Sequence, residues 1–229
     1  KRTSILYLFT SFLLAYIVYK SNQSKKGFIP YFLSKKVWLG TSALVDYSII
    51  LTNIFVKIIL ITPFLFLGLQ IQMAINDLLI SIFGVSEFEI SKTVLIIFYT
   101  ISIWIFSDLS TYIVHYLFHR IPFLWEFHKI HHSATTMNPF TLYRIHPIEL
   151  IINNLKSLFV YGLVTGVFYY LASGEVGALT FVGVNVFTFL FMFFGANLRH
   201  SHVKLKFYNW LENIVISPFQ HQIHHSDNP

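Results

Sequence analysis

The chain has 229 residues, of which 55% are hydrophobic and only 11% are charged. Soluble domains carry about 25% charged residues, so this composition excludes a disordered chain, a nucleic-acid-binding tail protein and an ordinary cytosolic enzyme. The 16 Lys and Arg outnumber the 10 Asp and Glu, and in so apolar a chain we interpret this excess as membrane topology, with no nucleic-acid partner. Cysteine is absent, which excludes disulfides, cysteine-ligated iron–sulfur clusters, thiolate haem and a cysteine nucleophile.

Apolar stretches in chain order predict the membrane spans, because a span needs about 20 mostly apolar residues. The candidates are residues 3–19, 43–69, 93–118, 150–171 and 176–198. The first of them is barely long enough to cross a bilayer. We therefore predict an all-α integral membrane protein with four to five transmembrane helices.

The charges between these stretches predict the orientation. Residues 20–42 hold five lysines and no acid, whereas residues 70–92 hold three acids and one lysine. The segments 119–149 and 199–229 carry three Lys or Arg each. Since Lys and Arg mark the cytoplasmic side, we expect the last two segments to form a cytoplasmic, histidine-rich cap. The membrane would be a bacterial inner membrane or the endoplasmic reticulum.

All 11 histidines lie in the second half of the chain, and most of them fall into three tight motifs. H-x-x-x-H places two imidazoles on one helix face, and H-x-x-H-H occurs twice. In H-x-x-H-H we expect the first two histidines to share a face and the adjacent third to serve a second ion. The motif histidines are His115, His119, His128, His131, His132, His221, His224 and His225.

Three further histidines lie in looser motifs. We expect His200 to complete the ligand set and count His146 as a further candidate, while an ordinary packing role stays open for His146 and His202. Eight or more imidazoles exceed what one ion binds, so the number suits two ions, and imidazole suits iron, zinc, copper or nickel. The H-E-x-x-H motif of zinc peptidases and the Glu-x-x-His pairs of ferritin-type di-iron sites are both absent.

Four charged residues lie near the histidine motifs. Asp108 interrupts an apolar helix seven residues before His115, and we predict that it accepts the ring N–H of His115 or of a neighbouring histidine. The alternative is a charge that helps helix packing. Glu149 could act similarly. We expect Arg120 and Arg144 to extend to lipid head groups.

The order of the motifs carries a family resemblance. D-x6-H-x3-H-R, L-W-x2-H-K-x-H-H-S, R-x-H-P-x-E, R-H-S-H and S-P-x-x-H-x-x-H-H-S follow one another within residues 93–229. This series resembles the fatty acid hydroxylase / sterol desaturase superfamily of membrane di-iron oxygenases. The resemblance implies a catalytic domain over residues 93–229, truncated at its C-terminus, after an N-terminal transmembrane region at 1–92.

The resemblance also implies the chemistry. Two iron ions held by the histidines would activate O2 to hydroxylate or desaturate a fatty acyl, sterol or alkylglycerol-type lipid, and the alkylglycerol branch adds tetrahydrobiopterin as reductant. No nucleotide-binding glycine motif is visible, so electrons would come from a pterin or from a protein such as a b-type cytochrome, a ferredoxin or a reductase. A histidine-rich membrane metal transporter and a bis-histidine haem protein remain alternatives.

Overall fold

The computed structural model describes residues 5–22, 27–173 and 186–226, which form helices and connecting turns with no strand among them. The chain divides into two compact units. Unit 1 consists of Lys1–Asn53, Glu126–His146 and Phe189–Pro229, and unit 2 consists of Ile54–Trp125 and Pro147–Thr188.

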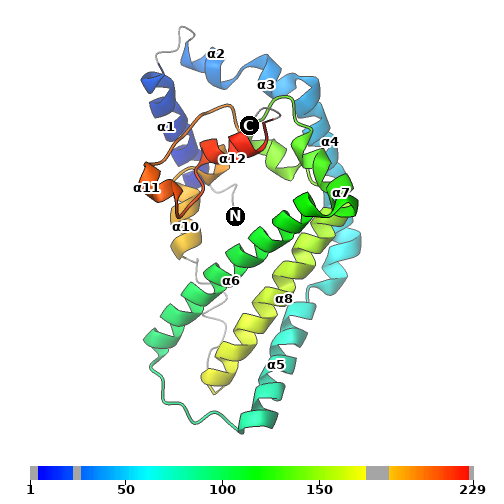
Figure 1. The fold of residues 1–229 in the computed structure, drawn as a ribbon, viewed down its shortest axis with the longest axis vertical. Helices are drawn as coiled ribbons and strands as arrows, with labels where there is room; N and C mark the ends of the chain where they lie inside the picture. Colours follow the sequence, from blue (N-terminus) through cyan, green and yellow to red (C-terminus); the bar gives the residue numbers. More distant parts are fainter. Residues whose placement is uncertain (1–4, 23–26, 174–185, 227–229) are drawn as a thin grey trace. The chain divides into compact units, whose positions relative to one another are not determined.

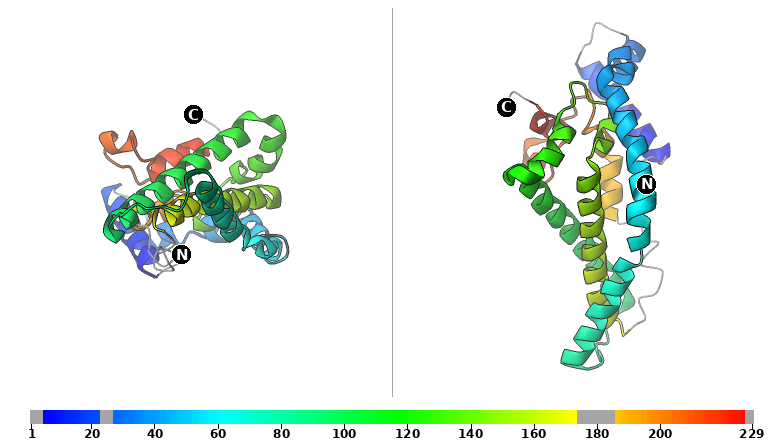
Figure 2. Two further views of the ribbon diagram at one scale, coloured as in Figure 1. Left: turned by 90° about the horizontal axis from the view of Figure 1, so that it is seen from below. Right: turned by 90° about the vertical axis from the view of Figure 1, so that its right-hand side faces the viewer.

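Unit 2 is built on long apolar helices. It contains the end of α4 (Thr41–Val56), the short η1 (Lys57–Ile61) and η2 (Thr62–Phe64), then α5 (Leu67–Phe83), α6 (Lys92–Arg120), the start of α7 (Pro122–His132) and α8 (Pro147–Leu171). Within this unit α5 and α6 both pack against α8 (Figures 1 and 2).

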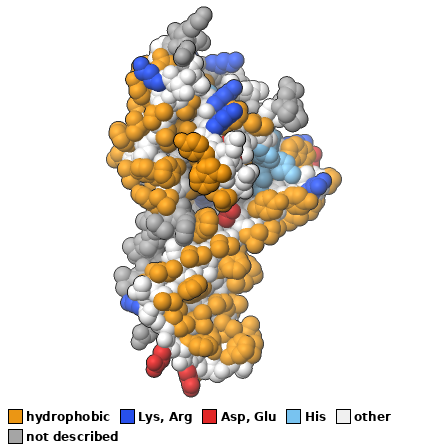
Figure 3. Space-filling model, turned by 60° about the vertical axis from the view of Figure 1, so that its left-hand side comes forward, with side chains coloured by type: hydrophobic (Ala, Val, Ile, Leu, Met, Phe, Trp, Pro, Cys, Tyr) orange, Lys and Arg blue, Asp and Glu red, His pale blue; other side chains and the backbone are white. Residues whose placement is uncertain are grey.

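Among the described residues, three helical runs are long and apolar enough to cross a membrane: Thr41–Phe83, Lys92–Arg120 and Pro147–Leu171. Large apolar side chains such as Phe66, Phe83 and Phe98 are exposed along these runs, and Figure 3 shows hydrophobic side chains covering much of the helical surface. An exposed apolar surface of this extent is typical of helices that face lipid. The predicted spans 93–118 and 150–171 are therefore confirmed as helices, each slightly longer than expected.

The helix that contains the predicted span 43–69 continues further than expected. Residues 70–83 were expected in an acidic loop after span 43–69, but they continue the helical run as α5, and the turn comes only at Gly84 with φ +79°. The reason is that Asp77 is the only charged residue in this stretch, so residues 70–83 are apolar enough to continue the preceding helical run. The first span appears as α1 (Ile5–Ser21), with 17 residues.

The last predicted span, 176–198, lies largely outside the described residues. Its described part is the helix α10 (Val186–Phe193) and the short η4 (Ala196–Leu198).

Close contact between α5 and α8 depends on glycine. A Cβ on Gly162 would lie 2.5 Å from the Gly68 carbonyl oxygen and 2.8 Å from Ile71 Cβ, whereas a Cβ on Gly68 would meet Leu158 at an ordinary 3.5 Å. We expect Gly162→Ala to lower the free energy of unfolding by about 1–3 kcal/mol through overpacking. Gly68→Ala is the matched control at the same helix contact, and SDS titration of both variants in mixed micelles measures the difference. Equal stabilities would contradict this account of the contact.

Unit 1 carries nine of the 11 histidines. It contains α1, α2 (Phe28–Phe32), α3 (Lys35–Leu39), most of α4, the end of α7, η3 (Pro139–Tyr143), the end of α10, η4, α11 (Asn209–Glu212) and α12 (Pro218–His224). Its apolar core joins Ala15 and Val18 of α1 to Leu198 and Val203, which flank the segment that bears His200.

Candidate metal centre

Four histidines of unit 1 converge on one point. They are His131, His200, His221 and His225, whose ligand nitrogens all lie within 4.8 Å of one another. The Nε2 atom of His200 lies 3.1 Å from Nε2 of His131 and 3.1 Å from Nε2 of His221, which in turn lies 3.2 Å from Nε2 of His225. Four imidazoles from three different segments therefore direct the same ring nitrogen to a shared centre.

The spacing and chemistry of this group fit a transition-metal ion. An ion about 2.0–2.1 Å from each imidazole nitrogen needs neighbouring nitrogens roughly 3 Å apart, which matches the observed separations. Burial lowers the pKa of His131 and of His200 well below the usual histidine value, and the neighbouring imidazoles lower both further. The neutral imidazole is the form that binds a metal, so these histidines are in the ligand form at neutral pH.

Local structure explains how α12 presents its two histidines. Ser217 and Gln220 form a reciprocal capping box with Pro218 at the first turn, which defines where the helix begins. His221 and His225 are then four residues apart and share one face of the last turn.

His200 comes from a loop and needs a different support. The Gln222 side-chain amide donates to the Leu198 carbonyl at 2.9 Å and to the Val203 carbonyl at 2.8 Å, on either side of His200. Gln222 thus ties the loop to α12. Gln222 was not predicted as a functional residue, because its only signal in the sequence is a position inside the second H-x-x-H-H motif.

The two H-x-x-H-H motifs divide differently from the expected pattern. In the first motif the Nε2 atoms of His128 and His132 lie 3.2 Å apart, while His131 belongs to the four-histidine group. In the second motif His221 and His225 both belong to the four-histidine group, and His224 does not. Residues i and i+4 on a helix differ by about 40° in direction and i and i+3 by about 60°, so the i, i+4 pair is the closer one.

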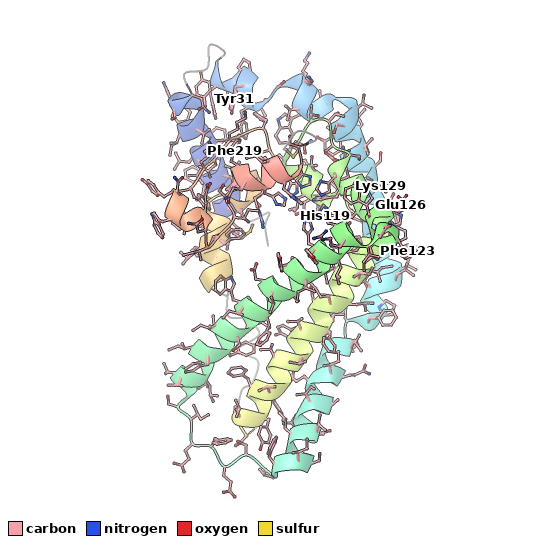
Figure 4. All side chains as sticks on the ribbon, in the orientation of Figure 1. Tyr31, His119, Phe123, Glu126, Lys129 and Phe219 are labelled. Carbon is pink, nitrogen blue, oxygen red and sulfur yellow. The ribbon has the colours of Figure 1, made fainter. Side chains whose placement is uncertain are left out.

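The exposed side of α7 carries no histidine ligand. Lys129, the second residue of the first H-x-x-H-H motif, forms an exposed ion pair with Glu126 (Figure 4). Glu126 and Lys129 are therefore exposed on this helix, whereas His128 and His131 are buried.

The remaining histidines lie outside the four-histidine group. The His224 ring lies 4.8 Å from the His132 ring, and burial followed by the charge of His128 lowers the His224 pKa. The His146 ring packs against Phe127 at 4.9 Å, and the His202 ring meets Tyr31 edge to face at 4.9 Å.

In unit 2, His115 and His119 share one face of α6, with ring centroids 4.7 Å apart, and His119 also contacts the Trp125 ring. Asp108 is exposed on the same helix and interacts electrostatically with Lys156 of α8, whose ammonium group donates to Thr111. Its predicted bond to a histidine ring N–H stays a prediction.

The expectation for Arg144 is wrong. Instead of extending to lipid head groups, its side chain is 3% exposed and pairs with the fully buried Asp46 of α4. A guanidinium with a buried carboxylate partner and further acceptors has no need of solvent, and Arg144 has both. Asp46 itself was missed, because the sequence shows it only as one acid near the start of an apolar stretch.

The described residues combine long apolar helices with a convergent histidine group that could hold a metal ion, a combination typical of membrane-bound metalloproteins. The family model described as fatty acid hydroxylase matches residues 100–229, which include every histidine motif. The match covers more than half of the chain, and the chain belongs to the fatty acid hydroxylase family. The family points to a membrane-bound, metal-dependent oxidoreductase that acts on lipids. No curated protein and no solved structure matches the chain significantly.

Proposed function

We propose that the protein is a membrane di-iron oxygenase that hydroxylates or desaturates a C–H bond of a fatty acyl, sterol or alkylglycerol-type lipid. The observation that carries this proposal is the convergence of His131, His200, His221 and His225 on one centre in a family of lipid oxidoreductases. Unactivated C–H bonds are beyond the acid–base chemistry of side chains, so a metal has to supply the oxidation.

A second ion needs its own ligands. We assign it His128 and His132, whose Nε2 atoms lie 3.2 Å apart, with His224 beside them and with the α6 pair His115 and His119. His146 remains an additional proposed ligand. Asp108 is proposed to orient a ligand histidine by accepting its second ring N–H.

When bound, the iron ions would supply O2 reduction coupled to C–H oxidation. For hydroxylation one oxygen atom enters the lipid and the other leaves as water, which consumes two electrons and two protons from outside the chain. The chain's part is to hold neutral imidazoles at fixed positions and to keep them buried. We propose an electron-donor protein or tetrahydrobiopterin as the reductant. We also propose four to five transmembrane helices and a cytoplasmic location for the site.

Isotope labelling tests this function directly. Cells that express the full chain would be grown under 18O2, and their lipids compared with those of cells that express His221→Ala at equal protein level. We expect a new lipid hydroxyl that carries 18O, or a new double bond without it, only with the parent chain. Elemental analysis of the purified protein would show whether the bound metal is iron.

Two controls separate the alternatives. A Soret band in the purified protein would indicate a bis-histidine haem protein, and metal uptake into liposomes would indicate a transporter. Unchanged lipids together with either signal would contradict the oxygenase.

A further inference from the structure

The N-terminal segment of unit 1 contributes a buried ion pair beside the metal centre. Arg144 Nε donates to Asp46 Oδ1 at 2.6 Å, and the two side chains are 3% and 0% exposed. The second carboxylate oxygen of Asp46 accepts from the Thr141 hydroxyl at 2.8 Å and from the Asn138 amide at 3.4 Å. Both oxygens of this carboxylate are therefore satisfied by the segment that leads into Arg144.

The other donors of Arg144 are also used. One terminal nitrogen donates to the Ser42 carbonyl at 2.5 Å and to the Ser42 hydroxyl at 2.8 Å, and the other donates to the Ser133 hydroxyl at 3.2 Å. Arg144 is thus held at once by α4 and by the residue that follows α7. A guanidinium used at each of its three nitrogens leaves the backbone of Arg144 little freedom to move.

That backbone touches the metal centre. Nδ1 of His131 lies 3.1 Å from the carbonyl oxygen of Arg144. A carbonyl oxygen can only accept, so Nδ1 carries the ring proton and Nε2 keeps its lone pair. Nε2 is the atom that lies 3.1 Å from Nε2 of His200 in the four-histidine group.

We propose that Asp46 and Arg144 are positioning residues of the metal centre. By holding the Arg144 carbonyl in place, the ion pair fixes both the protonated nitrogen and the ring orientation of His131, so that its lone pair points into the four-histidine group. The inference rests on the proposed metal centre and deepens it. It also extends the functional unit to Asp46, which lies outside the matched residues 100–229.

The alternative is that the ion pair only stabilises the fold. Buried ion pairs are weak evidence for stability by themselves, because burial of the two charges offsets their attraction. The carbonyl of Arg144 would then accept from His131 equally well without the pair. A test must therefore measure which ring nitrogen of His131 carries the proton, and not only the amount of folded protein.

The experiment uses the full chain in nanodiscs with Asp46→Asn, which keeps the shape of the side chain and removes its charge. Zinc affinity would be measured by competition with a chelator. The 15N shifts of the His131 ring, assigned by their loss in His131→Gln, would be measured in the metal-free protein. Asn53→Ala is the matched control, because Asn53 also lies on α4 and its amide donates to the neighbouring Ile145 carbonyl at 2.8 Å.

We expect the wild-type ring to carry its proton at Nδ1, and Asp46→Asn to spread that proton over both nitrogens. Loss of a residue that orients a ligand typically lowers metal affinity by about 10–100-fold, and we expect a loss of this size. Asn53→Ala should change neither value. If Asp46→Asn does not fold, the double variant Asp46→Leu/Arg144→Leu replaces it, because it leaves no unpaired buried charge.

Three results would overturn the inference: a wild-type proton at Nε2, wild-type zinc affinity and ring shifts in the folded variant, or equal losses in Asn53→Ala. Failure of the proposed function would look different. A wild-type chain that binds zinc and shows the Nδ1 proton, but yields no oxidised lipid, would contradict the oxygenase and leave the positioning role intact.

Discussion

Replacement of His200 with alanine is expected to empty the four-histidine group, halve the metal content of each chain and lower O2-dependent lipid oxidation at least about 100-fold. His200 has this effect because its Nε2 atom is the one that lies within 3.1 Å of both His131 and His221. Its side chain is buried, and the loop that bears it is tied to α12 by Gln222.

His202→Gln is the matched control for this prediction. His202 lies two residues further along the same loop, and its ring packs against Tyr31 and not against the four-histidine group. Metal per chain by elemental analysis and oxidised lipid per chain would be measured for both variants at equal protein level. Normal metal content in His200→Ala, or equal losses in the two variants, would remove His200 from the ligand set.

The histidine motifs could be predicted from the sequence because residue type and spacing alone indicate candidate metal ligands. His115 and His119 share a face of α6, as their spacing predicts, whereas His221 groups with His225 and not, as expected, with His224. The assignment of His131 to a different group from His128 could not be predicted, since it depends on which helix face meets α12 and the His200 loop. Spacing arguments give the direction of a side chain on its own helix, but its partners come from tertiary packing.

The buried ion pair between Asp46 and Arg144, in contrast, could not be predicted from the sequence. Asp46 and Arg144 are 98 residues apart, and neither lies in a pattern that requires a partner. An arginine near a membrane surface most often extends to head groups, so the sequence favoured the wrong environment. Only the fold reveals that Ser42, Asp46 and Ser133 surround the same guanidinium, and that Thr141 donates to the Asp46 carboxylate.

Sidedness follows from the long helices of unit 2. The 29 residues of α6 rise about 43 Å, more than the hydrocarbon core of about 30 Å, so Lys92 and Arg120 would lie on opposite sides of a bilayer. The loop before α6 carries Glu87 and Glu89. The end of α8 lies at that loop too, because the Tyr170 hydroxyl donates to the Gly84 carbonyl and the Ser173 hydroxyl to the Ser86 carbonyl.

Single cysteines are therefore expected to label from opposite sides of the membrane. Thr135→Cys and Ser226→Cys, both exposed and close to the histidine motifs, should react with an impermeant maleimide only when the cytoplasmic face is accessible. Glu87→Cys should react only from the other face, because basic segments stay in the cytoplasm and the acidic loop crosses. The chain has no cysteine of its own, so the parent protein should not be labelled and serves as the negative control. Labelling of Thr135→Cys and Ser226→Cys from different sides would separate α7 from α12 by a bilayer, and a metal centre shared by His131 and His225 would then be impossible.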